Sequence, residues 1–180
     1  MRGFTLIELV ASTATLAIIL SAGTPALISM IENHYATTSL SSLRTTLMSA
    51  RNIALINTQE TTVCPMKNDA CVNDWNQPLA VFADINSNLE LEPNESLHLI
   101  VSNEIHRGHW QKKRSSMYYI KFSPQGHAFS SATTFLYCPD SGKGTHAKQL
   151  VISFQGRIRT NSYLSSGGAP YAALAPLSCL

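Results

Sequence analysis

Hydrophobic residues dominate the start of this chain, with few polar interruptions between Phe4 and Gly23. As a helix this stretch would be about 30 Å long, which matches the hydrocarbon core of a membrane. The pattern therefore predicts a transmembrane helix over residues 4–24. Arg2 precedes the run and the next basic residue is Arg44, so the positive-inside tendency places the N-terminus in the cytoplasm and the rest of the chain outside.

The helix is expected to continue beyond the membrane, because apolar residues keep recurring at helical spacing. They form one apolar stripe whose members are three or four residues apart: Leu40, Leu43, Leu47, Ala50 and Ala54. Poor helix formers lie between them, so packing against the rest of the protein must hold this part. We predict one N-terminal helix over residues 4–57, bent or loosened at Pro25.

From Thr61 the pattern changes to short runs rich in β-branched and aromatic residues, separated by Pro, Gly, Asn and Asp. The runs are TTVCPM, LAVFADI, SLHLIVS, SMYYIKF, TTFLYC, KQLVISF and RIRT. Regularly spaced short strands favour an antiparallel sheet. We therefore predict an α+β fold, in which the long helix packs on a β-rich head of residues 58–180 with a C-terminal tail over residues 160–180.

Glu8 is the one charged residue between Phe4 and Gly23, and a carboxylate costs about 2.5–3.5 kcal/mol at mid-membrane and less near the end of a span. If the chain is cut between Gly3 and Phe4, the new amine lies one helical turn from Glu8. It can then pair with that carboxylate or with the Glu8 of a neighbouring chain. The stretch GFTLIELV thus indicates processing followed by assembly, whereas a plain membrane anchor needs no carboxylate.

This N-terminal stretch resembles that of type IV pilins and type II secretion pseudopilins. The resemblance implies that a prepilin peptidase removes residues 1–3 by cutting after Gly3, and that it N-methylates Phe4. It also implies that Glu8 recruits and aligns the next subunit during assembly. The implied partners are other major and minor pilins, the prepilin peptidase and the bacterial inner membrane, which the chain would cross once, with a periplasmic head, before it joins the pilus fibre or its tip.

The head resembles the FimT and GspH branch of these proteins. Four stretches carry the resemblance by their order: CPMKNDACVNDW, VFADINSN, LYCPDSG and VISFQGRIRT. Together with the N-terminus it covers residues 3 to about 160 and implies a type IV pilin-like fold. No motif follows Thr160.

The four cysteines, Cys64, Cys71, Cys138 and Cys179, all lie outside the apolar N-terminus, which fits two disulfides in an oxidising compartment. Three connectivities exist, and pairing of neighbours, Cys64 with Cys71 and Cys138 with Cys179, is the simplest. A zinc site is the alternative, but neither pair has metal-finger spacing and the histidines are scattered, so we predict no metal.

The stretch DINSNLELEPNE places Asp84, Asn86, Asn88 and Glu95 at positions 1, 3, 5 and 12 of a calcium loop. Position 6, which needs Gly for a sharp turn, is Leu89, and no helix is predicted on either side. We therefore favour a turn built from Asx side chains over a calcium site.

Charge is distributed unevenly along the chain. Lys and Arg against Asp and Glu number 3 and 2 in residues 1–53, 1 and 8 in residues 54–104, and 9 and 1 in residues 105–180, which gives net charges of +1, −7 and +8. The basic C-terminal part suits a polyanion such as nucleic acid, and ordinary solubility charge is the alternative.

Within this basic part, QGRIRT gives the strongest functional signal. Gly156 can make a turn, after which extended residues would direct Arg157 and Arg159 to one side with Cα atoms about 6.8 Å apart. That is twice the ~3.4 Å between charges along one DNA strand, and the planar guanidinium donates to phosphate oxygens in pairs. In a FimT-like minor pilin, a GRxR motif implies DNA binding during natural transformation. The predicted supporting residues are Lys112, Lys113, Arg114, Lys143 and Lys148.

Two functions of different classes are consistent with these patterns. In the first, which the GRIR motif favours, the chain is a minor pilin that binds DNA without sequence preference for uptake. In the second it is a structural pseudopilin at the tip of a secretion or pilus fibre, with Arg157 and Arg159 in subunit contacts. No motif for nucleophilic, metal-dependent or phosphate-loop catalysis is present, so we expect no enzyme activity, no catalytic residues and no cofactor.

Overall fold

The computed structural model describes residues 5–102, 107–113, 116–128, 133–142, 146–162 and 179. The chain divides into two compact units, Met1–His34 and Tyr35–Leu180, each of which is described by itself. We call the second one the head unit. The predicted cleavage site at Gly3 and Phe4 lies outside the described residues, as does most of the predicted tail.

One helix, α1 (Leu6–Asn57), has 52 residues and lies close to the predicted range of 4–57. It continues through Pro25, although proline removes one helical hydrogen bond. In the first unit its large apolar side chains are exposed, from Leu6 to Leu27. The helix is long and apolar enough to cross a membrane.

Glu8 caps the start of α1, a role that the sequence analysis did not predict. Its Oε2 accepts hydrogen bonds from the backbone N of Thr5 at 3.0 Å and from Thr5 Oγ1 at 2.9 Å. In return, the backbone N of Glu8 donates to Thr5 Oγ1 at 3.4 Å. This reciprocal arrangement is a capping box, T-x-x-E, which satisfies donors that a helix N-terminus otherwise leaves unpaired.

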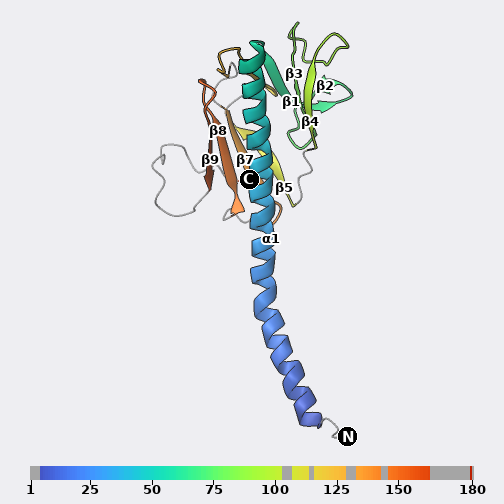
Figure 1. Ribbon diagram of the computed structural model, residues 1–180. Coiled ribbons are helices and arrows are strands. Elements are labelled where there is room, and N and C mark those ends of the chain that lie inside the picture. Colours follow the sequence, from blue (N-terminus) through green and yellow to red (C-terminus); the bar gives the residue numbers. More distant parts are fainter. Residues whose placement is uncertain are drawn as a thin grey trace. The chain divides into compact units, whose positions relative to one another are not determined.

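Two antiparallel sheets make up the β part of the head unit (Figure 1). The first has the order β2-β1-β3-β4, and β6 also pairs with β1. Its strands are β1 (Thr61–Lys67), β2 (Ala70–Cys71), β3 (Leu79–Phe82), β4 (Leu97–Val101) and β6 (Ile120–Phe122). The second has the order β5-β7-β8-β9, with β5 (Gly108–Lys113), β7 (Thr133–Pro139), β8 (Lys148–Ile152) and β9 (Ile158–Ser162).

The predicted apolar stripe of α1 forms the centre of the core. Leu43, Leu47, Ala50 and Ala54 are fully buried, and Leu40 packs against the same cluster. Both sheets contribute to this cluster, for example with Val63 of the first and Phe135 and Leu150 of the second. The predicted packing of the helix on an antiparallel β-rich head is confirmed. The apolar residues at helical spacing pack against the buried faces of two antiparallel sheets.

The strand predictions are wrong mainly at β5, where charged residues interrupt the apolar pattern. The run HWQKKR lies almost entirely in β5, in which Trp110 is buried in the core and His109 and Gln111 on either side are half-buried. In contrast, SMYYIKF yields only the three residues of β6. The last strand, β9, continues to Ser162 and so includes the start of the predicted tail.

Both disulfides join the pairs that spacing favoured. Cys64 is bonded to Cys71, with Cα atoms 5.6 Å apart, and this bond links β1 to β2. Cys138 in β7 is bonded to Cys179, with Cα atoms 5.5 Å apart. The second disulfide therefore ties Cys179 to β7, an inner strand of the four-stranded sheet.

Candidate nucleic-acid interface

The site that sequence analysis placed at QGRIRT is built from two tight turns of the same design. The first turn, residues 123–127, has the sequence SPQGH and follows β6. Ser123 N donates to the carbonyl of His127 at 2.8 Å, and Gly126 N donates to the carbonyl of Ser123 at 2.8 Å. Gly126 has a φ of 77°. A type I turn followed by a left-handed residue has this bonding pattern, and the left-handed position favours Gly.

The second turn, residues 153–157, has the sequence SFQGR and joins β8 to β9. Ser153 N donates to the carbonyl of Arg157 at 3.0 Å, and Gly156 N donates to the carbonyl of Ser153 at 2.8 Å. Gly156 has a φ of 73°. In each turn the serine Oγ also accepts from the backbone N of the fifth residue, at 3.1 Å for His127 and 3.2 Å for Arg157. The two turns thus repeat one S-x-Q-G design.

The two turns interlock. Ala128 N, directly after the first turn, donates to the carbonyl of Phe154 in the second turn at 2.9 Å. A Cβ atom on Gly156 would overlap the Gly126 carbonyl oxygen, so only glycine allows the backbones to approach this closely. Because the first turn follows the five-stranded sheet and the second belongs to the four-stranded sheet, this contact ties the sheets together.

Arg51 of α1 holds the pair of turns from the helix side. Its Nε donates to the carbonyl of Gly126 at 2.9 Å, across 75 residues of sequence. The same Nε would lie 2.9 Å from a Cβ on Gly156, so the guanidinium is next to the residue that precedes Arg157. Sequence analysis missed Arg51, since an arginine within a helix gives no local sign of a partner this distant.

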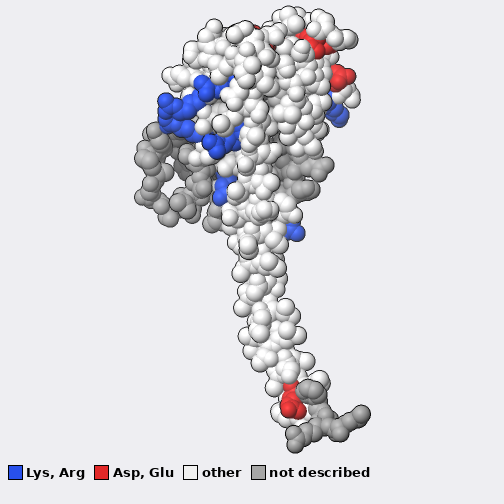
Figure 2. Space-filling model, in the orientation of Figure 1, with Lys and Arg blue, Asp and Glu red and all other residues white. Residues whose placement is uncertain are grey.

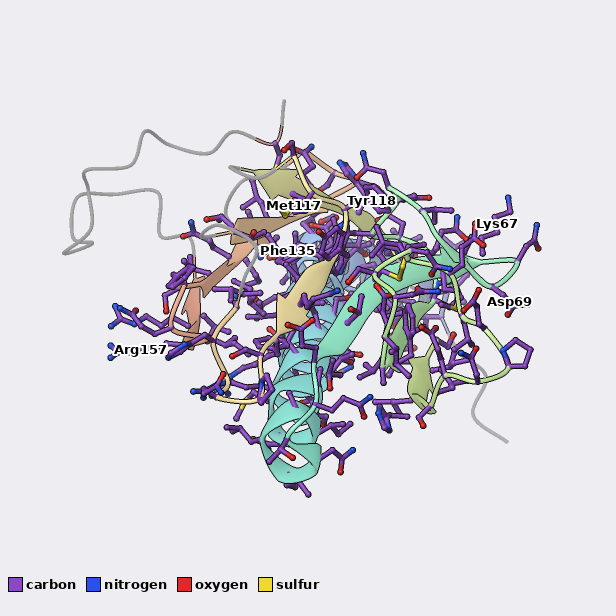
Figure 3. All side chains as sticks on the ribbon, turned by 90° about the horizontal axis from the view of Figure 1, so that it is seen from above. Lys67, Asp69, Met117, Tyr118, Phe135 and Arg157 are labelled. Atoms are coloured by element: carbon purple, nitrogen blue, oxygen red, sulfur yellow. A yellow bond between two sulfur atoms is a disulfide. The ribbon has the colours of Figure 1, made fainter. Side chains whose placement is uncertain are left out.

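Arg157 and Arg159 are both exposed, while Ile158 between them packs against the core. This is the alternation that an extended segment predicts. Arg159 lies opposite Val151 of β8, and Ile158 lies opposite the buried Ile152. In Figure 3, Arg157 extends outward from the second turn, on the other side of the head unit from Lys67 and Asp69.

Gly156 itself is buried and has no side chain with which to bind a ligand. Its part in the GRxR stretch is to set the turn that begins the arginine pair. We call Arg51, Arg157 and Arg159 the basic turn surface. Figure 2 shows Lys and Arg atoms gathered on the side of the head unit that carries β8 and β9, and Asp and Glu atoms mainly on the other side.

Of the other predicted basic residues, Lys112 and Lys148 lie away from this surface. Lys112 is in β5, at the opposite edge of the sheet from β9, and three strand spacings correspond to about 14 Å. Its ammonium is buried 5.7 Å from the Trp75 ring centre, and this burial lowers the pKa of Lys112 to about 8. Lys148 pairs with Ser162, at the end of β8 away from the second turn. Arg114, Lys143 and the side chain of Lys113 lie outside the described residues.

The DINSNLELEPNE loop forms the predicted Asx turns. Asn86 Oδ1 accepts from Asn88 N at 3.1 Å, and Asn88 Oδ1 accepts from Glu90 N at 2.9 Å. The fully buried Asp84 carboxylate faces the Lys121 ammonium at 3.7 Å, and that ammonium donates to Ser87 Oγ at 2.7 Å. A side-chain cation of the protein therefore lies beside the first position of the calcium pattern.

Comparisons with known proteins agree with this architecture. The family model for type II transport protein GspH matches residues 39–156. The chain is similar to two crystal structures of the type IV minor pilin FimU of Pseudomonas aeruginosa, strain PAO1. The first match has a TM-score of 0.60 at 21% identity and covers 84% of this chain and 99% of the chain in that crystal structure. The second has a TM-score of 0.55 at 21% identity and covers 80% of this chain and 99% of the chain in that structure. No curated protein sequence gives a match.

A long N-terminal helix whose second half packs on antiparallel sheets is the type IV pilin fold, which the chain shares with FimU. The match covers more than half of the chain, so the protein belongs to the GspH family of type II transport proteins. The matched region ends at Gly156. Arg157 and Arg159 therefore lie directly beyond the part of the chain that this family model describes.

Proposed function

We propose that this minor pilin binds DNA without sequence preference, through Arg157 and Arg159, and captures it for uptake in natural transformation. The observation that carries the proposal is the exposed arginine pair, which begins directly after the buried, interlocked Gly156. The interlocked turn fixes the backbone of Arg157, and pairing of β9 with β8 fixes that of Arg159, so little backbone entropy is lost on binding. Arg51 adds a third positive charge next to the turn.

The chemistry of this surface matches phosphate rather than base edges. Arginine donates to phosphate oxygens in pairs, and contacts with the backbone fix a protein on DNA without reading its sequence. Two or three such contacts give modest affinity, which should be near the micromolar range of non-specific binding and should fall steeply with salt. Unrelated DNA sequences are expected to bind similarly.

Assembly into a fibre with other pilins is the second part of the proposal. The prepilin peptidase would cut after Gly3 and methylate Phe4, and Glu8 would then align the subunit with its neighbour in the inner membrane. The capping box at Thr5 adds a requirement, because Glu8 must exchange or share its bonds within the first turn of α1 when it pairs with another chain. Glu8→Ala should still be processed and remain in the membrane, but should enter fibres poorly.

A structural adaptor at the tip of a secretion pseudopilus or pilus is the alternative, and the family match to a type II transport protein favours it. The experiment that separates the two compares the wild type with the double variant Arg157→Gln/Arg159→Gln in cells. DNA binding predicts that the double variant loses transformation while it is still processed, oxidised and assembled. The adaptor predicts a defect in secretion or piliation, and a purified wild-type protein that binds no DNA at physiological salt.

A further inference from the structure

Phe154 projects an aromatic ring at the start of the second turn. It is 56% exposed, although phenylalanine is normally buried, and it is two positions before Gly156. Its backbone is fixed, because its carbonyl accepts the hydrogen bond from Ala128 N at 2.9 Å. A single exposed apolar residue needs no explanation on its own, but this ring has a planar partner.

That partner is His127, the last residue of the first turn. The two rings are stacked, with centroids 6.4 Å apart and an angle of 23° between their planes. Both His127 and Phe154 are exposed, so both rings are accessible to solvent and are not buried in the core. The interlocked turns therefore hold two near-parallel rings, one of which, Phe154, belongs to the same turn as Arg157.

We infer that the Phe154 and His127 rings form a stacking platform for a DNA base, so that the basic turn surface prefers single-stranded DNA to duplex. The inference rests on the DNA binding proposed above. Proteins that bind single strands combine cations that follow the backbone with aromatic rings on which unpaired bases stack, and here Phe154 and Arg157 lie on one turn. In a duplex the bases already stack on each other and expose only their edges.

Charge favours a nucleic acid over another protein as the occupant of these rings. The one acidic residue in residues 105–180 is Asp140. It follows the end of β7 that lies away from the second turn, because Thr133 at the other end pairs with Ile152. Along a strand, seven residues span about 23 Å. Within residues 105–180, neither ring has a carboxylate close to it in sequence, and Phe154 is followed by Arg157 and Arg159.

The test uses the full-length chain in non-ionic detergent and fluorescence anisotropy with three labelled ligands. They are a 20-nucleotide oligothymidylate, an abasic strand of the same length and charge, and a 20-base-pair duplex. We expect the wild type to bind the oligothymidylate at least about fivefold more tightly than the abasic strand. Phe154→Ala should remove that difference without changing the salt dependence, and Phe154→Trp should keep it. Ile100→Ala, at a residue 58% exposed in the other sheet, is the matched control and should change nothing.

The outcomes separate this inference from the proposal on which it rests. If the oligothymidylate and the abasic strand bind equally well, and Phe154→Ala matches the wild type while Arg157→Gln weakens binding, the stacking platform is wrong and DNA binding stands. If no ligand binds, both are wrong. If Phe154→Ala leaves DNA binding intact but reduces incorporation into fibres, the rings contact another pilin, which also overturns the inference. Circular dichroism and intact disulfides verify that Phe154→Ala is folded.

Discussion

The turns at residues 123–127 and 153–157 share one backbone design and differ in what they expose. Both place serine at the first position and a buried left-handed glycine at the fourth. The first turn exposes His127 and has a half-buried Pro124, whereas the second exposes Arg157 and Phe154. The shared positions set the shape, and the variable positions set the surface chemistry. A motif such as GRxR therefore combines a structural requirement, the glycine, with a separate functional one, the arginines.

The two glycines also differ in how much they are constrained. A Cβ on Gly126 would be 3.1 Å from Arg51 Nε and 3.2 Å from Leu55 Cδ2, both of which belong to movable side chains. On Gly156 it would overlap the backbone of the first turn, which cannot move without breaking the interlock. The second turn is thus the more tightly defined of the two, and it is the one that carries the arginine pair.

The largest expected effect is that of Gly156→Ala, which should lower the free energy of unfolding by about 3 kcal/mol or more. Gly126→Ala should cost about 1–2 kcal/mol, from its positive φ and a tight fit against side chains. Gly142→Ala is the control, because Gly142 has a φ of 68° but open space around it, and should cost about 1 kcal/mol. Urea unfolding with intact disulfides measures all three. Equal costs for Gly156 and Gly142 would contradict the interlock.

Removing the link from the helix to the turns should have a smaller effect. Arg51→Met deletes the hydrogen bond to the Gly126 carbonyl and leaves that acceptor without its side-chain donor, which should cost about 1–2 kcal/mol. Arg44→Met, at an exposed arginine two helical turns earlier, is the matched control and should stay within about 0.5 kcal/mol of the wild type. If both variants unfold at the same urea concentration, Arg51 does not hold the turns.

Lys112 in β5 and Arg157 in the second turn differ in burial. The ammonium of Lys112 is buried, whereas Arg157 is exposed. Burial lowers the pKa of Lys112 from 10.5 to about 8, so keeping the ammonium charged in the folded state costs free energy at neutral pH. After discounting for partial solvent exposure, Lys112→Met should raise the free energy of unfolding by about 1 kcal/mol or less at pH 7.

The pH dependence of this effect has a definite sign. Between pH 8 and 10.5 the unfolded chain retains the Lys112 proton that the folded chain has lost, so wild-type stability rises with pH. The advantage of Lys112→Met should therefore shrink across this range. Arg157→Met should show no such trend. Urea unfolding at pH 7 and pH 10 measures both variants. If Lys112→Met raises the free energy of unfolding equally at both pH values, burial does not destabilise the charged ammonium.

Sequence patterns predicted those parts of the fold that depend on local spacing. The helical stripe from Leu40 to Ala54 and strands such as β7 and β8 follow directly from apolar periodicity. The strand β5 was missed because its sequence, GHWQKK, has no apolar alternation, and the buried Trp110 is its one large apolar residue. The capping box at Thr5 and Glu8 was readable as T-x-x-E, but the membrane setting of Glu8 suggested intermolecular pairing instead.

The site was predictable only in part, and for a physical reason. Alternation along an extended segment is local, so the exposure of Arg157 and Arg159 could be inferred. The hydrogen bond from Arg51 to Gly126 and the contact between the two glycines join distant segments, and no local pattern encodes them. The S-x-Q-G pattern occurs at residues 123–126 and again at 153–156, but a match of three residues is too short to predict a contact. Its meaning is clear only from the hydrogen bond that joins the two turns.

The most direct test of the account is the salt dependence of duplex DNA binding by the full-length protein in non-ionic detergent. Replacement of Arg157 or Arg159 by Gln should flatten the slope of log affinity against log salt by about 0.9 each, because each change removes about one phosphate contact with the duplex. Arg44→Gln, at an exposed arginine two helical turns before Arg51, is the control and should leave the slope unchanged. If the three variants share the wild-type slope, or if the wild type binds no DNA, the arginine pair is not a phosphate-binding site.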